Sequence, residues 1–302
     1  MLRFHLNHSC PFSSQGFEDP LDIISLAEKA EAVGLNSVWT SEHLFHSSYI
    51  ADRLDNLPYY EPLSILCAVA MRTHKIRLGT TVIVLPWHDP PRLAKTVATL
   101  DLLSQGRVDL GVGVATTEDE YINLGVDFKT RGKRANEILS ALQILWTEEI
   151  PEYHGEFYRY SGLKFSPKPK QKPYPPIHVG GSSMAALRRT ARFGDGWHTL
   201  RQSPDDIREK LPILEQLMQE AGRDPNSLYI SINAGIRFDG KPQDREPKDR
   251  KLISGSNQDI IDTLAAFSNS GCHEVVVSIA SREQSFHEDL LDRIAAEILP
   301  YI

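Results

Sequence analysis

The sequence predicts a closed barrel of eight parallel β-strands that alternate with α-helices, the (β/α)8 or TIM barrel, with insertions. Strand-like apolar runs and helical patterns alternate along the whole chain. Several of the strand-like runs are continuously apolar, which is typical of parallel strands covered by helices on one side and barrel contents on the other. The length of 302 residues suits one such domain spanning residues 1–302. An open doubly wound sheet is the alternative, but Asn7 and His8 follow the first strand, where that fold needs a glycine-rich turn.

The strand and helix predictions follow from periodicity and from the residues that end each element. Glycine commonly follows the last turn of a helix, so Gly34 and Gly106 end two of the expected helices. The apolar run "IRLGTTVIVL" reads as one strand in which Gly79 permits a bulge or a close approach of the backbone. The expected strands are 2–7, 37–41, 76–85, 107–114, 177–179, 197–200, 228–234 and 274–279. The expected helices are 22–33, 62–72, 92–104, 134–146, 184–193, 204–221 and 257–269.

Two stretches interrupt this alternation and are expected to be insertions. Residues 148–176 read as a hairpin, "YHGEFYRYSGLKFSP", followed by a Pro- and Lys-rich link. Residues 237–256 are polar and highly charged, and we expect part of this stretch to be disordered. Insertions of this length in a barrel often serve as lids or contact partners.

Composition and charge exclude several classes of function. The net charge of −7 is mild, and Lys and Arg are scattered, which argues against a nucleic-acid partner. No apolar run reaches the roughly 20 residues of a membrane span, and the N-terminus lacks the pattern of a signal peptide. Cys10, Cys67 and Cys272 are far apart and form no CxxC motif, so neither a disulfide framework nor a zinc site is expected. We therefore expect a cytoplasmic protein with a small-molecule substrate.

The segment "IHVGGSSMAALRRTARFGDGW" joins a strand to a helix through two glycines and two serines. Backbone N–H groups at a helix start bind anions, and glycines let a phosphate approach that backbone. The same residues also suit a tight connection in which Ser182 or Ser183 caps the helix. The residues alone leave both interpretations open.

The active site of such a barrel lies at the carboxyl ends of its strands. The side chains expected there include few acids and no lysine, which argues against a metal-dependent hydrolase and a Schiff-base aldolase. His43, just beyond a strand and beside Glu42, is a candidate for proton transfer, although a histidine that only satisfies loop backbone is the plainer alternative. The residues expected at the strand ends are Asn7, His8, Glu42, His43, Thr80, Thr81, Val114 to Thr117, Gly180 to Ser183, Trp197, His198, Asn233 and Ser278.

Several separated motifs together resemble a known family. "VWTSEHLF", "YYEPLSIL", "RLGTTVIVLPWHDPPRLAKTVATLDLLSQGRVDLGVGV", "EYINLGVDFKTRGKR" and "PPIHVGGSSMAALRRTARFGDGW" are similar to luciferase-like monooxygenase (LLM) superfamily proteins, above all to their F420-dependent oxidoreductase subgroup. The resemblance covers about residues 38–198 in unbroken order. It implies a (β/α)8 barrel and a deazaflavin or flavin cofactor.

The resemblance also implies roles for individual residues. His43 would face the reactive ring of the cofactor, accompanied by Glu42, and no metal is implied. The chain has Ala115 and Thr116 where many relatives have Gly-Trp, and its first strand ends unusually at Asn7 and His8. We expect these departures to change the contacts with the substrate more than the contacts with the cofactor. The cofactor contacts implied are Thr80, Thr81, Val114, Gly180, Gly181, Ser182, Ser183 and Met184. The expected substrate pocket comprises Asn7, His8, Ala115, Thr116 and Trp197.

The leading hypothesis is hydride transfer between F420 and a small organic substrate. The alternatives are a two-component monooxygenase that uses FMNH2 and O2, with a separate cofactor-reducing enzyme, and a barrel subunit that binds flavin without catalysis. A phosphate-handling isomerase lacks the acid or lysine base that it would need at the strand ends. By resemblance to luciferase-like barrels, which often pair, we expect a homodimer.

Overall fold

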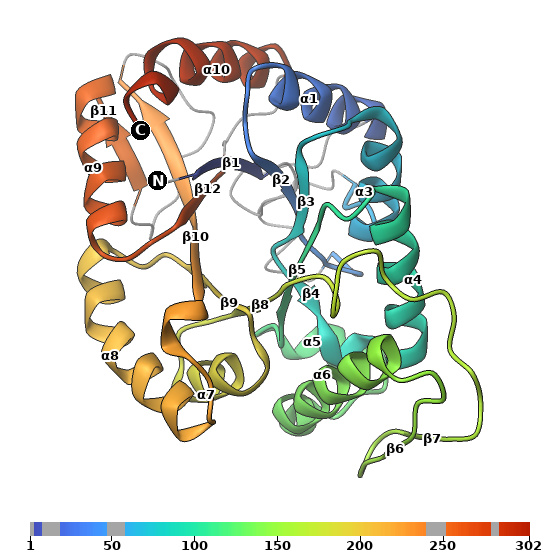
Figure 1. Ribbon diagram of the computed structural model, residues 1–302. Coiled ribbons are helices and arrows are strands. Elements are labelled where there is room, and N and C mark those ends of the chain that lie inside the picture. The colour runs from blue at the N-terminus through green and yellow to red at the C-terminus, as the bar shows by residue number, and fades with distance from the viewer. Residues whose placement is uncertain (1–2, 8–18, 47–57, 240–251, 279–283) are drawn as a thin grey trace.

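The computed structural model describes residues 3–7, 19–46, 58–239, 252–278 and 284–302. Within these residues, ten strands form one curved sheet with helices packed around its outside (Figure 1). Eight of the strands pair in the order β1-β2-β3-β5-β8-β9-β10-β12, and β12 pairs with β1, so the sheet closes on itself. All of these pairings are parallel, and the predicted barrel is confirmed.

The element bounds agree closely with the periodicity of the sequence. The barrel strands are β1 (Arg3–Asn7), β2 (Ser37–Thr40), β3 (Arg77–Thr80), β5 (Val108–Gly113), β8 (Ile177–Gly180), β9 (Gly196–Leu200), β10 (Tyr229–Phe238) and β12 (Glu274–Ser278). The helices are α1 (Pro20–Ala32), α3 (Pro62–Arg72), α4 (Pro90–Leu103), α5 (Glu118–Asn123), α6 (Arg131–Thr147), α7 (Met184–Phe193), α8 (Pro204–Glu220), α9 (Asn257–Asn269) and α10 (Gln284–Glu297). α5 and α10 are not among the helices expected from the sequence.

The expected strand at 76–85 is interrupted. β3 ends at Thr80, and the chain resumes as β4 (Ile83–Val84), which pairs with β5 instead. The intervening peptide bond, Thr81–Val82, is cis. The irregularity in this strand therefore follows Thr80, at the carboxyl end of β3, and does not lie at Gly79.

The two expected insertions differ in structure. In the first, β6 (Tyr153–His154) and β7 (Arg159–Tyr160) form the predicted antiparallel hairpin. The second was predicted as a polar insertion over 237–256, but β10 continues to Phe238, and β11 (Leu252–Gly255) pairs in parallel with it. Both ends of the expected insertion are thus in strands, and β11 lies outside the closed ring of eight strands. Residues 240–251 lie outside the described residues.

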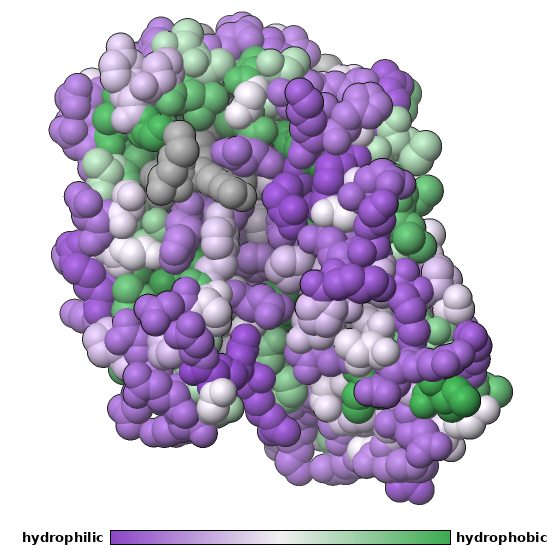
Figure 2. All heavy atoms as spheres, in the orientation of Figure 1, coloured by the Kyte–Doolittle hydropathy of each residue, from purple (hydrophilic) through white to green (hydrophobic). Residues whose placement is uncertain are grey.

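Two environments are separated by the sheet. Alternate strand residues pack outward against the helices and form the hydrophobic core, which includes Leu78, Val112, Val179 and Val277. The residues between them point into the barrel and are largely polar. The outer surfaces of the helices are also polar, and hydrophilic residues prevail on the face drawn in Figure 2.

Trp39 occupies the barrel interior and has no exposed surface. The backbone of neighbouring strands approaches it at glycines. A Cβ atom on Gly79 would lie 2.2 Å from the Trp39 ring, and one on Gly111 would lie 1.7 Å from the Thr80 carbonyl oxygen. No side chain fits at either position, so glycine is a packing requirement here.

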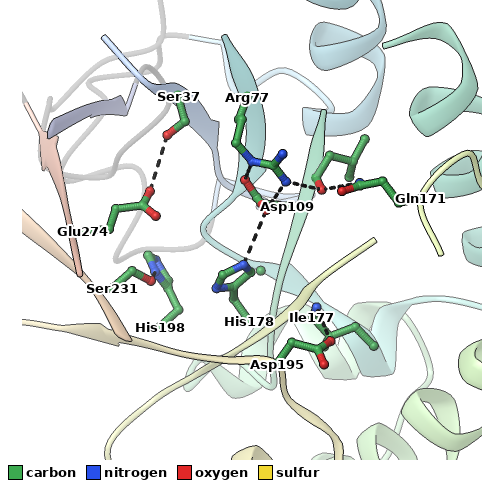
Figure 3. A network of polar contacts seen from close by, with 12 residues as sticks. Ser37, Arg77, Asp109, Gln171, Ile177, His178, Asp195, His198, Ser231 and Glu274 are labelled. Carbon is green, nitrogen blue, oxygen red and sulfur yellow. Dashed lines mark hydrogen bonds and ion pairs between the residues drawn. The ribbon is translucent and has the colours of Figure 1, made fainter. Parts of the chain in front are cut away.

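Towards the amino ends of the strands, a partly buried ion pair joins Arg77 of β3 to Asp109 of the neighbouring β5 (Figure 3). The Arg77 guanidinium donates to both Asp109 oxygens, at 2.6 and 2.5 Å. His178 Nε2 lies 3.6 Å from Asp109, too far for a direct hydrogen bond. Burial would raise the pKa of Asp109, but His178 and Arg77 hold it well below its usual value. The charge of Asp109 is therefore compensated within the barrel.

Replacing Gly111 with alanine is expected to destabilise the protein by more than about 3 kcal/mol, because the added methyl group overlaps the Thr80 carbonyl. Gly132→Ala in α6 is the matched control, since the nearest atom to its Cβ position is 3.5 Å away. Urea unfolding measures both variants. Equal stability of Gly111→Ala and Gly132→Ala would contradict the packing requirement.

Candidate active site

His43 lies just beyond β2, where Glu120 of α5 holds its ring. The His43 Nδ1 atom is 2.8 Å from Glu120 Oε2. Glu120 Oε1 accepts hydrogen bonds from the N–H groups of Leu44 and Phe45, so one carboxylate fixes both the ring and the backbone that follows it. Thr117 donates a further hydrogen bond to Glu120. His43 Nε2 has no hydrogen-bond partner among the described residues and is the atom left for a ligand.

The electrostatics of this pair favour an ionised Glu120. Glu120 is 1% exposed, and burial would raise its pKa. The hydrogen bond and charge of His43, with the two backbone N–H groups, outweigh burial and lower the pKa of Glu120 below its ordinary value. The Glu120 carboxylate at Nδ1 therefore fixes the orientation of the His43 ring.

Aromatic side chains surround His43. The rings of Tyr59 and Trp87 lie 5.3 and 6.2 Å from it, and Tyr121 packs edge-on against Trp87. The Trp87 indole N–H is buried and finds no hydrogen-bond partner among the described residues. A buried donor without a partner is costly, so this N–H is a suitable contact for a bound molecule.

Glu42 points to different partners from those of its neighbour. Its two carboxylate oxygens accept hydrogen bonds from the Val84 N–H, at 2.7 Å, and from His88 Nε2, at 2.8 Å. The side chain is 2% exposed. Glu42 thus joins the end of β2 to β4 and to the turn before α4, whereas Glu120, which the sequence analysis did not single out, holds His43.

The break between β3 and β4 places Thr80 and Thr81 differently. Thr80 is fully buried, and its hydroxyl donates to the Gly111 carbonyl oxygen. Thr81 is half-buried, and its hydroxyl contacts His198 Nε2 at 2.7 Å. Val82 then lies against Gly113 and Gly180, where a Cβ atom would meet its methyl groups at 2.6 and 3.1 Å. Only Thr81 of the two threonines has exposed surface on the site.

The turn from β8 to α7 has the exposed glycine expected for an anion site and also the serine cap expected for a tight connection. Gly181 is exposed and has a φ of +103°, a conformation that favours glycine. Ser183 is the N-cap of α7, and its hydroxyl accepts from the Ala186 N–H. Ser182 is half-buried and Met184 is exposed at the first helical position. The first turn of α7 leaves backbone N–H groups without helical partners.

The predicted substrate residues are dispersed. Trp197 has no exposed surface and belongs to the core outside the barrel, where its indole N–H donates to the Gly181 carbonyl oxygen. This placement corrects the prediction that Trp197 lines a substrate pocket, because strand alternation turns His198 inward and Trp197 outward. Val114 and Ala115 are half-buried after β5, and Thr116 is exposed. Asn7 ends β1 beside Trp39 and Ser278, and His8 lies outside the described residues.

The described residues contain neither a metal-binding cluster nor a helix that could span a membrane. They contain no group of three or more His, Cys, Asp or Glu side chains arranged to hold a metal ion. None of their helices combines the length and apolarity needed to cross a membrane.

The Glu42–His88 pair predicts a pH dependence of stability. Burial lowers the pKa of His88, but the hydrogen bond and charge of Glu42, with the charge of Glu61, raise it above its ordinary value. The stabilisation is therefore complete below the ordinary pKa of about 6.5 and is lost as the pH rises through the raised pKa.

The loss of this pair is measured by urea unfolding of the wild type and His88→Gln at about pH 5.5 and about pH 8.5. The variant is expected to be less stable at both, by about 3 kcal/mol at the lower pH and by less at the higher. His154→Gln, on the exposed β6–β7 hairpin, is the control. A stability gap that does not shrink with pH would disprove the assignment.

Comparison with known proteins shows the family to which the chain belongs. The family described as luciferase-like monooxygenase matches residues 2–274. An uncharacterised protein of Mycobacterium tuberculosis is 34% identical over 229 residues, which are 72% of this chain and 78% of that protein. The crystal structure of the monooxygenase RslO1 from Streptomyces bottropensis has a TM-score of 0.83 at 24% identity and covers 99% of both chains, which shows the fold.

Two relatives differ in the cofactor that their names give. An F420-dependent glucose-6-phosphate dehydrogenase of Amycolatopsis mediterranei is 31% identical over 182 residues, 59% of this chain and 53% of that protein. An FMNH2-dependent dimethylsulfone monooxygenase of Pseudomonas putida is 29% identical over 214 residues, 70% of this chain and 56% of that protein. With its closed parallel barrel, the chain is a member of the luciferase-like monooxygenase family, whose proteins are F420- or FMN-dependent oxidoreductases and monooxygenases.

Proposed function

We propose that the protein is an F420-dependent oxidoreductase that transfers a hydride to or from a small organic substrate. The observation that carries the proposal is the His43–Glu120 pair at the carboxyl end of β2. When bound, F420 would supply the hydride chemistry at its deazaflavin ring. Hydride transfer to or from a carbon that bears oxygen also requires a proton to move at that oxygen, and we assign this proton transfer to His43.

The division of labour between His43 and Glu120 follows from their contacts. Glu120 is a positioning residue, because it holds Nδ1 of His43 and contacts the backbone that follows. His43 Nε2 is then the atom that accepts the substrate proton in a dehydrogenation or donates it in a reduction. Glu42 acts further from the chemistry, through β4 and His88.

The residues around this pair fit a planar, phosphate-bearing cofactor. The unpartnered Trp87 N–H and the half-buried Thr81 suit the ring, beside Val114 after β5. Gly180, Gly181, Ser182, Ser183 and Met184 suit the phosphate, since they combine an exposed glycine backbone with the start of α7. A small-molecule substrate in contact with Asn7, His8, Ala115 or Thr116, a homodimer and a cytoplasmic location belong to the same proposal.

The FMNH2-dependent monooxygenase is the second candidate, and the similarity to the dimethylsulfone monooxygenase favours it. FMN carries a planar ring and a phosphate too, so the same residues would hold it. A separate cofactor-reducing enzyme would then be a partner. A barrel that binds flavin without catalysis is the third candidate, and the braced His43 argues against it.

Titration of the purified protein with F420 and, separately, with FMN tests the choice of cofactor. We expect F420 to bind in the micromolar range or tighter and FMN to bind at least about tenfold more weakly, measured by quenching of cofactor fluorescence. The reverse order would support the monooxygenase. Binding of neither cofactor would refute both candidates.

His43→Ala tests the role of the proton donor. We expect kcat to fall by about 100-fold or more, because a general acid–base group is lost, while the Kd of the cofactor changes by less than about threefold. Glu120→Gln should lower kcat by about tenfold, since the amide leaves the ring without its charged partner. Glu118→Gln, exposed on the same helix, is the matched control and should match the wild type. Unchanged kcat in His43→Ala would refute the proposed role.

A further inference from the structure

His198 is a buried histidine inside the barrel that the proposed function does not use. It lies on β9, is 3% exposed, and its ring stacks on Trp39 at 5.0 Å with an interplanar angle of 2°. Each ring nitrogen meets a hydroxyl group: Nδ1 lies 2.8 Å from Ser231 Oγ and Nε2 lies 2.7 Å from Thr81 Oγ1. Figure 3 shows the Ser231 and His198 side chains next to each other. Burial and the charge of His178 lower the pKa of His198 to about 3. The ring is therefore neutral, with one nitrogen that donates and one that accepts.

Ser231 determines which nitrogen carries the proton. Its side chain is fully buried, and His198 Nδ1 is the one partner that the described residues offer its hydroxyl group. A buried O–H without an acceptor is costly, so Ser231 donates to Nδ1. Nδ1 is then unprotonated, and the proton of the neutral ring lies on Nε2. His198 therefore donates to Thr81 Oγ1.

Thr81 Oγ1 receives a second hydrogen bond from Asn233. The Asn233 amide nitrogen lies 3.2 Å from Thr81 Oγ1 and donates to it, and the amide oxygen accepts the Ser278 hydroxyl at 2.8 Å. A hydroxyl oxygen accepts two hydrogen bonds and donates one. Both acceptor positions of Thr81 are thus filled, and no described residue accepts its proton.

The Thr81 hydroxyl can donate its proton to a ligand at the carboxyl ends of the strands, where the candidate site lies. Thr81 is half-buried at the break between β3 and β4, at the carboxyl ends of the strands. We propose that His198 is a positioning residue which, with Asn233, makes Thr81 donate a hydrogen bond to an acceptor atom on the ring of the bound cofactor. This inference rests on the proposed function, because it takes the ligand to be F420 or FMN, both of which carry ring carbonyl oxygens.

The protonation state of His198 can be measured in the full-length wild-type protein without a cofactor. Long-range ¹H–¹⁵N NMR of ¹⁵N-histidine-labelled protein distinguishes the two neutral forms, and comparison with His198→Phe assigns the signals. We expect a neutral ring protonated at Nε2 between about pH 5 and about pH 8. A ring protonated at Nδ1, or at both nitrogens, would overturn the inference whatever the variants show.

A double-mutant cycle tests whether His198 acts through Thr81. Thr81→Val, which removes the hydroxyl but keeps the shape, should raise the Kd of the cofactor by about tenfold, and Thr81→Ser should remain within about twofold of the wild type. His198→Phe, which keeps a ring against Trp39, should raise Kd several-fold in the wild type and not further in Thr81→Val. Equal effects in both backgrounds would show that His198 acts elsewhere. Thermal unfolding checks that each variant is folded.

The outcomes separate this inference from the function on which it rests. If the wild type binds neither F420 nor FMN, the proposed function fails, and this inference fails with it. If either cofactor binds the wild type and Thr81→Val equally well, only this inference fails.

Discussion

The indole of Trp39 fills the middle of the barrel, and the arrangement around it depends on that one side chain. Gly79 lacks a side chain because the ring occupies its space, and Gly111 brings the backbone of β5 close to that of β3. The flat face of the indole also supports the ring of His198. A large side chain inside a barrel usually competes with neighbouring residues for space. Here the neighbouring strands carry glycine at Gly79 and Gly111, which leaves room for the indole.

Polar side chains line the barrel interior on both sides of Trp39, towards the amino ends and towards the carboxyl ends of the strands. Towards the amino ends of the strands, Arg77 and Asp109 neutralise each other. Towards the carboxyl ends, neutral hydrogen bonds run from His198 to Thr81 at the break in β3. Charge is thus compensated towards the amino ends, and neutral donors and acceptors surround Thr81, whereas the carboxylate–imidazole pairs of Glu42 and His43 lie apart from it. An uncharged lining of this kind suits a ring system, whose polar atoms form directional hydrogen bonds without the desolvation cost of an ion.

Two adjacent residues, Glu42 and His43, show how the site is held. They follow β2 in sequence, yet each forms its own carboxylate–imidazole pair with a residue from a distant segment. Glu42 ties the chain to His88, and Glu120 ties His43 to α5. The loop after β2 is therefore restrained on both sides. Rigid placement of a proton-transfer group contributes to rate because small displacements are costly.

The barrel could be predicted from the sequence because period-2 and period-3.6 patterns are local and repeat many times. The break in β3 could not, because "TTVIVL" reads as one continuous apolar strand. The position of Trp197 could have been corrected from the sequence, since a polar His198 directed into the barrel requires its neighbour to face the helices. Glu120 is different. It follows two other acidic residues, Glu118 and Asp119, and no local pattern distinguishes it from them. Only its contact with His43, which lies 77 positions earlier in the sequence, does so.

The pairing of β1 with β12 has a consequence for how the chain is made. Arg3 lies opposite Glu274, so β1 is synthesised long before the strand that becomes its neighbour. Until then β1 presents an open backbone edge, and such edges promote association with other chains. Contacts between positions so far apart in sequence also slow folding. The barrel can therefore close only after β12 has been synthesised, however early the other strands pair.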